Sequence, residues 1–176
     1  MATSIQANLA NPLEFDLQGT LAGYWVAVLR VVTGYWFLHA GITKFAFIAG
    51  EPFSAQGYLV NAPAASPIQG FLVWAGQTPW LLEFTNFMIP VGETLIGLGL
   101  VAGALVRLAS LFGGVLMVFF YLGNASWSHG LVNGDLMGLM LFVTVGILGA
   151  GRVLGLDAIL EQTELGKKRI AKCLLG

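Results

Sequence analysis

Two ionisable residues, Arg30 and Glu93, lie deep inside apolar stretches of a chain in which only 10% of the 176 residues are charged. A charge in the middle of a membrane span costs roughly 2.5–3.5 kcal/mol on insertion scales, so such residues mark structural or functional sites. At a helical rise of about 1.5 Å per residue, each lies roughly 14–16 Å from the same end of its span. We therefore predict that the two pair, directly or through one intermediary. The pair would fix the helix register or bind a polar head group, such as a quinone carbonyl or an oxyanion.

A second group of polar residues is expected at the other ends of the spans, and each of the four spans contributes at least one residue to this group. Its members are His39, Lys44, Glu83, Asn124, His129 and Asp135. Together they could bind an anionic donor or move protons, because a neutral imidazole beside a carboxylate can relay protons. Each also has a structural explanation: a lysine reaching the interface, an acid at a helix N-terminus, or a hydrogen-bonded core histidine.

These considerations give a candidate site with two kinds of residue. His39 and Asp135 are the candidate catalytic residues. The candidate residues for binding quinone or substrate are Arg30, Glu93, Lys44, Glu83 and Asn124.

Several other classes of chemistry are disfavoured by the composition. The chain has two histidines without His-x-x-x-His spacing and no cysteine cluster, so no metal site is predicted, and haem ligation by His39 and His129 is a weak alternative. Cys173 is the single cysteine, which excludes intramolecular dithiol chemistry. A net charge of −1 without a broad basic stripe argues against a nucleic-acid partner.

Four apolar spans must position these residues. They are predicted at 21–47, 83–104, 105–123 and 134–154, and 57% of the chain is hydrophobic. A helix of about 20 residues crosses the hydrocarbon core of a bilayer, so each span suffices. The predicted fold class is therefore an all-α, four-transmembrane-helix bundle. The long connection 48–82 contains an apolar stretch at 67–77 that is too short to span, and we expect it to form a short interfacial helix.

The distribution of positive charge predicts the orientation. Six of the eight Lys and Arg residues fall on one side of the four spans, which places both termini in the cytoplasm by the positive-inside rule. The chain then divides into an N-terminal cytoplasmic segment 1–20, a membrane domain 21–154 and a basic cytoplasmic tail 155–176. We expect a multi-pass protein of the cell membrane whose first span directs insertion, because 1–19 lacks the features of a signal peptide. The spacing of Gly99 and Gly103 favours close helix packing, with a homo-oligomer as a possible use.

Several short motifs together resemble a known family. In the first span the motifs are Arg30, Gly34, His39-Ala40-Gly41 and Lys44-Phe45. The second span contains Gly92-Glu93-Thr94, and Arg107-Leu108-Ala109 follows it. The fourth span contains Asn133-Gly134-Asp135 and Gly149-Ala150-Gly151-Arg152, and Leu156-Asp157 lies beyond it. Across roughly residues 22–160, the chain resembles the DoxX/DoxD family of small four-helix membrane proteins.

The resemblance implies a function in respiratory or sulfur redox chemistry. It suggests the membrane subunit of a quinone-linked redox system, which passes electrons from thiosulfate or a similar donor to quinone together with a separate partner subunit. One alternative is a non-enzymatic membrane scaffold that recruits redox partners. A small transporter is less favoured, because the chain has no evident inverted repeat. Fold alone does not decide between these functions.

Overall fold

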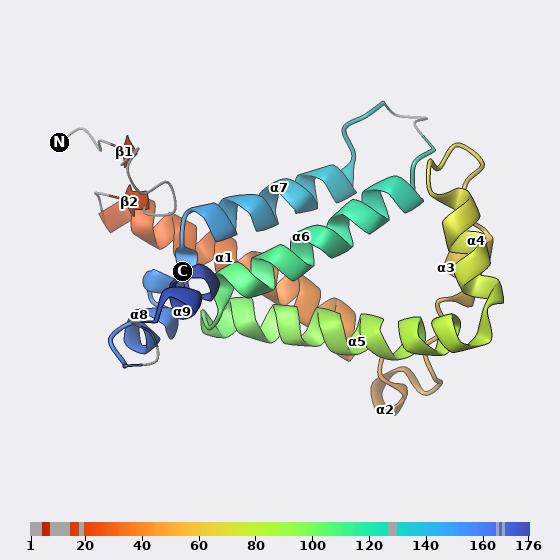
Figure 1. Ribbon diagram of the computed structural model, residues 1–176, viewed down its shortest axis with the longest axis horizontal. Helices are drawn as coiled ribbons and strands as arrows, with labels where there is room; N and C mark the ends of the chain where they lie inside the picture. Colours follow the sequence, from red (N-terminus) through yellow and green to blue (C-terminus); the bar gives the residue numbers. More distant parts are fainter. Residues whose placement is uncertain (1–4, 8–14, 18–19, 127–129, 165, 167) are drawn as a thin grey trace.

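The computed structural model describes residues 5–7, 15–17, 20–126, 130–164, 166 and 168–176. Four helices run side by side along the long axis of the molecule: α1 (Thr20–Ile42), α5 (Pro79–Ala102), α6 (Val106–Gly123) and α7 (Gly134–Ile147) (Figure 1). Three of these are long and apolar enough to cross a membrane, over 21–42, 79–102 and 106–123. They indicate a membrane protein.

The other elements are short and lie at the two ends of this helical body. At one end are α2 (Ala46–Ala49), α3 (Gln56–Val60) and α4 (Gln69–Gln77). At the other end are the antiparallel strands β1 (Ile5–Ala7) and β2 (Phe15–Leu17), the 3-10 helix η1 (Ala150–Arg152), α8 (Asp157–Leu160) and α9 (Arg169–Leu174). We call the second end the basic end, because Arg107 and Arg152 lie there.

The connection between α1 and α5 forms a cap, by which we mean α3 and α4 together. These two helices pack on each other and stand across the ends of α5 and α6, which diverge at this side of the molecule (Figure 1). The short helix predicted within 67–77 is α4. Helix α3 was not predicted from the sequence.

Glycines set the register between the antiparallel helices α1 and α5. A Cβ on Gly97 would lie 2.2 Å from the backbone nitrogen of Leu38, and a Cβ on Gly34 would lie 2.7 Å from the backbone nitrogen of Val101. The two backbones therefore approach as closely as small residues allow. In this register Arg30 lies against Gly103, so α1 extends about ten residues, or roughly 15 Å, beyond the end of α5.

Replacing Gly97 by alanine is expected to destabilise the protein by about 1–3 kcal/mol, because the added methyl forces two helix backbones apart. The matched control is Gly92→Ala on the same helix, where a Cβ would meet nothing within 4 Å. This control should be neutral or slightly stabilising, since Ala is favoured over Gly in a helix interior by roughly 0.5–1 kcal/mol. Unfolding in mixed SDS micelles, followed by circular dichroism, measures both. Equal stability of the two variants would contradict this register.

The predicted fourth span, 134–154, does not form one helix. Helix α7 ends at Ile147, and Gly149 adopts a φ of +59°, a left-handed conformation that terminates the helix and leads into η1. The chain then returns to bond the end of α5, where the N–H groups of Leu156 and Asp157 donate to the carbonyls of Ala102 and Gly103. With 14 residues, α7 is shorter than a full membrane span.

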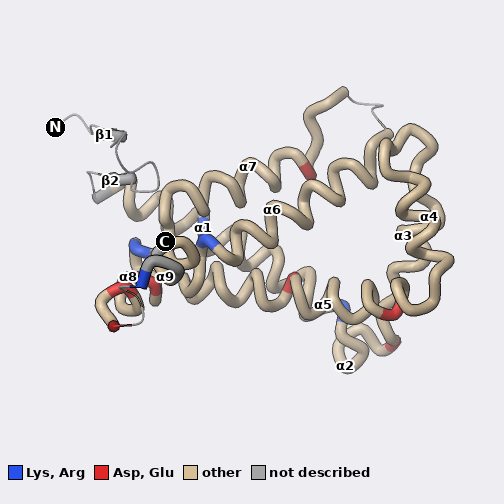
Figure 2. Tube along the Cα trace, viewed as in Figure 1, with Lys and Arg blue, Asp and Glu red and all other residues tan. Residues whose placement is uncertain are grey.

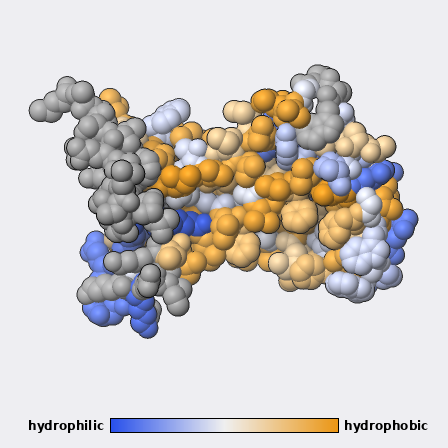
Figure 3. All heavy atoms as spheres, turned by 45° about the horizontal axis from the view of Figure 1, so that its top comes forward, coloured by the Kyte–Doolittle hydropathy of each residue, from blue (hydrophilic) through white to orange (hydrophobic). Residues whose placement is uncertain are grey.

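The basic tail 155–176 contains short helices rather than one continuous helix. It forms α8 and α9, and Gly176 is buried against the helical body, where its carbonyl accepts a hydrogen bond from the N–H of Gly151. Lys and Arg residues gather near α8 and α9 in Figure 2. Figure 3 shows a mostly hydrophobic band across the middle of the molecule, with hydrophilic residues towards both ends. The surface therefore has the distribution that a bilayer requires.

Candidate functional site

A buried ion pair joins the end of α1 to the middle of α5. The ammonium Nζ of Lys44 lies 2.5 Å from Oε2 of Glu93 and also donates to the carbonyl of Ala40 at 3.0 Å. The Glu93 side chain is 4% exposed and that of Lys44 is 26% exposed. A carboxylate so far from water is stable as a charge only with a hydrogen-bonded cation beside it. Glu93 lies about 14 Å from the basic end of α5, roughly halfway along the neighbouring α6.

The local sequence explains why Lys44 reaches Glu93. Helix α1 ends at Ile42, and the close contact of Gly41 with Pro90 and Thr94 brings the following turn against α5. Pro90 is buried inside α5 and lacks the N–H that a helix would use there. One turn beyond it, Glu93 faces the end of α1.

The ion pair lies at one wall of an apolar cavity of about 450 Å³, which we call the cap cavity. The cavity is enclosed by α3, α4, α5 and α6. Most of its lining is aromatic or aliphatic, and its principal residues are Phe53, Tyr58, Leu72, Ala75, Ile89, Leu116 and Phe120. The Phe53 ring also lies 5.8 Å from Nζ of Lys44, a cation–π distance. An apolar cavity of this size with a few polar groups is typical of a small-molecule site.

The opening of the cap cavity faces apolar surface rather than polar surface. Four lining side chains are large, hydrophobic and exposed: Phe71, Phe84, Met88 and Phe119. In a membrane such side chains lie against lipid. A hydrophobic ligand could therefore enter the cavity sideways from the bilayer.

Two hydrogen bonds hold the cap over the cavity. The N–H of Ala55 donates to the side-chain oxygen of Asn86 on α5 at 2.7 Å. The hydroxyl of Ser66 donates to the carbonyl of Leu122 on α6, also at 2.7 Å. The cap is thus fixed to both of the helices that diverge beneath it, which keeps the cavity formed.

Tyr58 lines the cap cavity, and its phenol hydroxyl lies near Gly123 at the end of α6. Burial raises the pKa of this phenol above its usual value, and the charge of Asp135 raises it further. Tyr58 therefore stays protonated at neutral pH and can donate a hydrogen bond.

The predicted pairing of Arg30 with Glu93 is wrong. Arg30 is 2% exposed, and its Nη2 donates to the carbonyl of Leu154 at 3.1 Å. Its Nε and Nη1 have no hydrogen-bond partner among the described residues. Arg30 would face Glu93 only if the basic ends of α1 and α5 were level, whereas the glycine contacts shift α1 along α5 by about ten residues, or roughly 15 Å. Lys44, expected at the outer end, takes the place opposite Glu93 instead.

The second predicted group is divided in the structure. Lys44 lies at the cap cavity, and Glu83 shares a shallow neighbouring cleft with it. Asn124 donates to the Asp135 carboxylate at 2.9 Å, at the loop between α6 and α7. His39 is exposed on α1 beside the ring of Tyr35, and His129 lies outside the described residues. These roles stay predictions, and His39, Glu83, Asn124 and Asp135 are not among the described residues that line the cap cavity.

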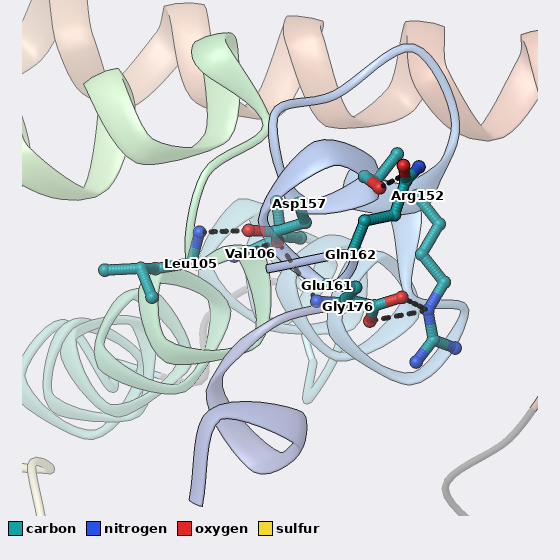
Figure 4. A network of polar contacts seen from close by, with 8 residues as sticks. Leu105, Val106, Arg152, Asp157, Glu161, Gln162 and Gly176 are labelled. Carbon is teal, nitrogen blue, oxygen red and sulfur yellow. Dashed lines mark hydrogen bonds and ion pairs between the residues drawn. The ribbon is translucent and has the colours of Figure 1, made fainter. Parts of the chain in front are cut away.

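Asp157, which entered the sequence motifs only within Leu156-Asp157, accepts several hydrogen bonds at the basic end (Figure 4). Its carboxylate is fully buried and accepts from the N–H groups of Leu105, Val106 and Gly176 at 2.7, 2.9 and 3.0 Å. It stabilises the N-terminus of α6 and is the acidic group whose charge acts on Arg30. A lone acid within an apolar segment (LGLDAIL) was the available signal.

The aromatic lining that the cap supplies could not be predicted from the sequence, because an apolar helix within a loop has no pattern that identifies the residues it packs against. Among the described residues, no three His, Cys, Asp or Glu side chains are grouped to hold a metal ion.

Comparisons with protein-family models, curated proteins and solved structures return no match to this chain. The resemblance to the DoxX/DoxD family therefore stays a prediction.

Proposed function

We propose that this chain is the membrane subunit of a quinone-linked redox system and that the cap cavity holds the quinone. The observation that carries the proposal is the Lys44–Glu93 pair at the wall of an aromatic cavity that opens onto apolar surface. A quinone needs such a combination, because its ring and tail are apolar and its carbonyl oxygens accept hydrogen bonds. The resemblance to the DoxX/DoxD family supports the same function.

The residues present fit a quinone head group. The Lys44 ammonium lies at the cavity wall and can donate a hydrogen bond to a carbonyl oxygen. Glu93 holds the ammonium in place and balances its charge, while the apolar walls exclude water. When bound, a quinone supplies a two-electron, two-proton acceptor. Lys44 and Glu93 then keep an exchangeable proton next to the reacting oxygen.

The electrons come from a donor outside this chain in our proposal. Thiosulfate or a similar anionic donor, oxidised by a partner subunit, is the donor that the family resemblance favours. His39, Glu83 and the Asn124–Asp135 pair do not line the cap cavity. They are available for contact with such a partner or for proton transfer.

We also propose that α1, α5, α6 and α7 form a four-helix bundle in the cell membrane, which the chain crosses several times. The basic end, with Arg107, Arg152 and Lys168, would face the cytoplasm together with both termini. The cap would then lie in the outer half of the bilayer as an interfacial helix pair, with Trp74 and Trp80 as exposed anchors. This depth gives lipid-dissolved quinone direct access to the cavity opening.

Filling the cap cavity tests the proposal. Ile89→Trp on α5 places a large ring into the cavity and is expected to reduce co-purifying quinone to less than a tenth of the wild-type level. The matched control, Leu95→Trp, adds the same ring to a 63%-exposed position of α5 outside the cavity lining and should retain quinone. Quinone and partner proteins are measured by mass spectrometry after mild-detergent purification from native membranes. Wild-type protein that carries a redox partner without quinone would instead favour the scaffold function.

A further inference from the structure

We propose that the shallow cleft that Lys44 shares with Glu83 admits water from the cap side of the membrane, so that the Lys44–Glu93 pair exchanges protons with that side. We call it the side cleft. It has a volume of about 400 Å³ and lies between α5 and the chain segment 44–53. The use of these protons for a quinone rests on the proposed function, whereas the water path itself does not.

Lys44 lies between the side cleft and the cap cavity. Lys44 and Phe53 line both spaces, whereas Glu93 lines the cap cavity but not the side cleft. The Phe53 ring lies 5.8 Å from Nζ of Lys44 and forms part of the wall between the two spaces. The Lys44 side chain is 26% exposed and that of Glu93 is 4% exposed, so water would meet the pair at the lysine.

A row of polar groups follows one face of α5 along the side cleft. Glu83, Asn86 and Pro90 are spaced by three and four residues, and all three line the cleft. Oδ1 of Asn86 is bonded to the N–H of Ala55, and its Nδ2 bonds no other described residue. Pro90 lacks an N–H, so the carbonyl of Asn86, four residues before it, lacks its usual helical donor. Water in the cleft therefore meets both a donor and an acceptor.

The mouth of the side cleft is fixed by Glu83. This carboxylate is exposed and lies about 10 Å along α5 from Pro90. A charge of this kind is costly in lipid, which places the mouth at the aqueous boundary. The volume of the cleft is enough for several water molecules, each of which occupies about 30 Å³ in the liquid. The cap cavity, in contrast, opens onto apolar surface.

The proton path ends at Nζ of Lys44. The groups that face this nitrogen are the Glu93 carboxylate from α5, the Ala40 carbonyl from α1 and the Phe53 ring. When one N–H bond of Nζ breaks towards the cap cavity, a new N–H bond forms with a proton from water in the side cleft. The charge of the ion pair is then restored. Only protons move along this path, because the electrons come from the donor outside this chain.

Cysteine accessibility in right-side-out membrane vesicles tests the path. The full chain carries Cys173→Ala, which removes the exposed native thiol, and one new cysteine. Val91→Cys lies in the side cleft, Ile89→Cys in the cap cavity, and Leu95→Cys at a 63%-exposed position that lines neither. A charged, membrane-impermeant methanethiosulfonate should modify Val91→Cys at least tenfold faster than the other two. Equal rates, or modification of Val91→Cys only after the vesicles are opened, would overturn the proposal.

A blocking variant tests whether protons use the same path. Ala46→Trp fills the side cleft from an exposed position outside the cap cavity lining, so it should protect Val91→Cys at least tenfold and leave quinone retention unchanged. It should also slow the reduction of retained quinone by dithionite at least fivefold. Full protection of the cysteine with an unchanged reduction rate would reject the proton path. Fast labelling of Val91→Cys in a chain that retains no quinone would support the water path and reject the proposed function.

Discussion

Replacing Lys44 by methionine is expected to abolish quinone retention and to lower the free energy of unfolding by about 3–5 kcal/mol. The substitution keeps most of the side-chain volume but leaves the Glu93 carboxylate buried without its cation. Glu93 would have to take up a proton or draw in water, and either disturbs the wall of the cap cavity. Unfolding in mixed SDS micelles gives the stability, and extraction of the purified chain gives the quinone content.

A double variant separates the two effects. Lys44→Met combined with Glu93→Leu removes both charges, so most of the lost stability should return, because apolar residues of similar volume often replace a buried pair at little cost. Quinone retention should not return, since the hydrogen-bond donor is still missing. A single variant that is as stable as the wild type, or a double variant that binds quinone normally, would contradict the role given to this pair.

Replacing Asp157 by alanine is expected to cost about 3–5 kcal/mol of unfolding free energy. Three backbone N–H groups would lose their common acceptor, and the charge of Arg30 would lose its nearby anion. Leu105, one of the three donors, has a left-handed φ of +52°, and the bond to Asp157 helps to hold this strained turn between α5 and α6. The same SDS titration measures the loss.

Two further variants control this experiment. Asp157→Asn keeps one acceptor oxygen but no charge, so its loss should be smaller than that of alanine. Glu161→Gln breaks the neighbouring ion pair with Arg152. The side chains of Arg152 and Glu161 are 33% and 26% exposed, so the variant should change the free energy of unfolding by no more than about 1 kcal/mol. If Asp157→Ala proved as mild as Glu161→Gln, the network in Figure 4 would not be a principal support of the basic end.

The apolar runs predicted the long helices well because hydrophobicity and length are local properties. Three of the four predicted spans are helices long enough to cross a membrane, and a short helix forms within 67–77 as expected. The helix boundaries were less predictable. Gly149 ends the fourth span early through a left-handed turn, and Pro79 begins α5 before Glu83 because proline suits the first turn of a helix.

The sequence by itself determined which residues are costly to place in a membrane, and Arg30, Lys44 and Glu93 are among them. It could not determine their partners, because partners depend on how far one helix is shifted along another. Contacts of Gly34, Gly41 and Gly97 set that shift, and they bring Lys44 rather than Arg30 to Glu93. The cap cavity and the Asp157 network likewise join segments far apart in the chain. Only the tertiary structure decides such contacts, because each depends on the close packing of backbones rather than on any local pattern.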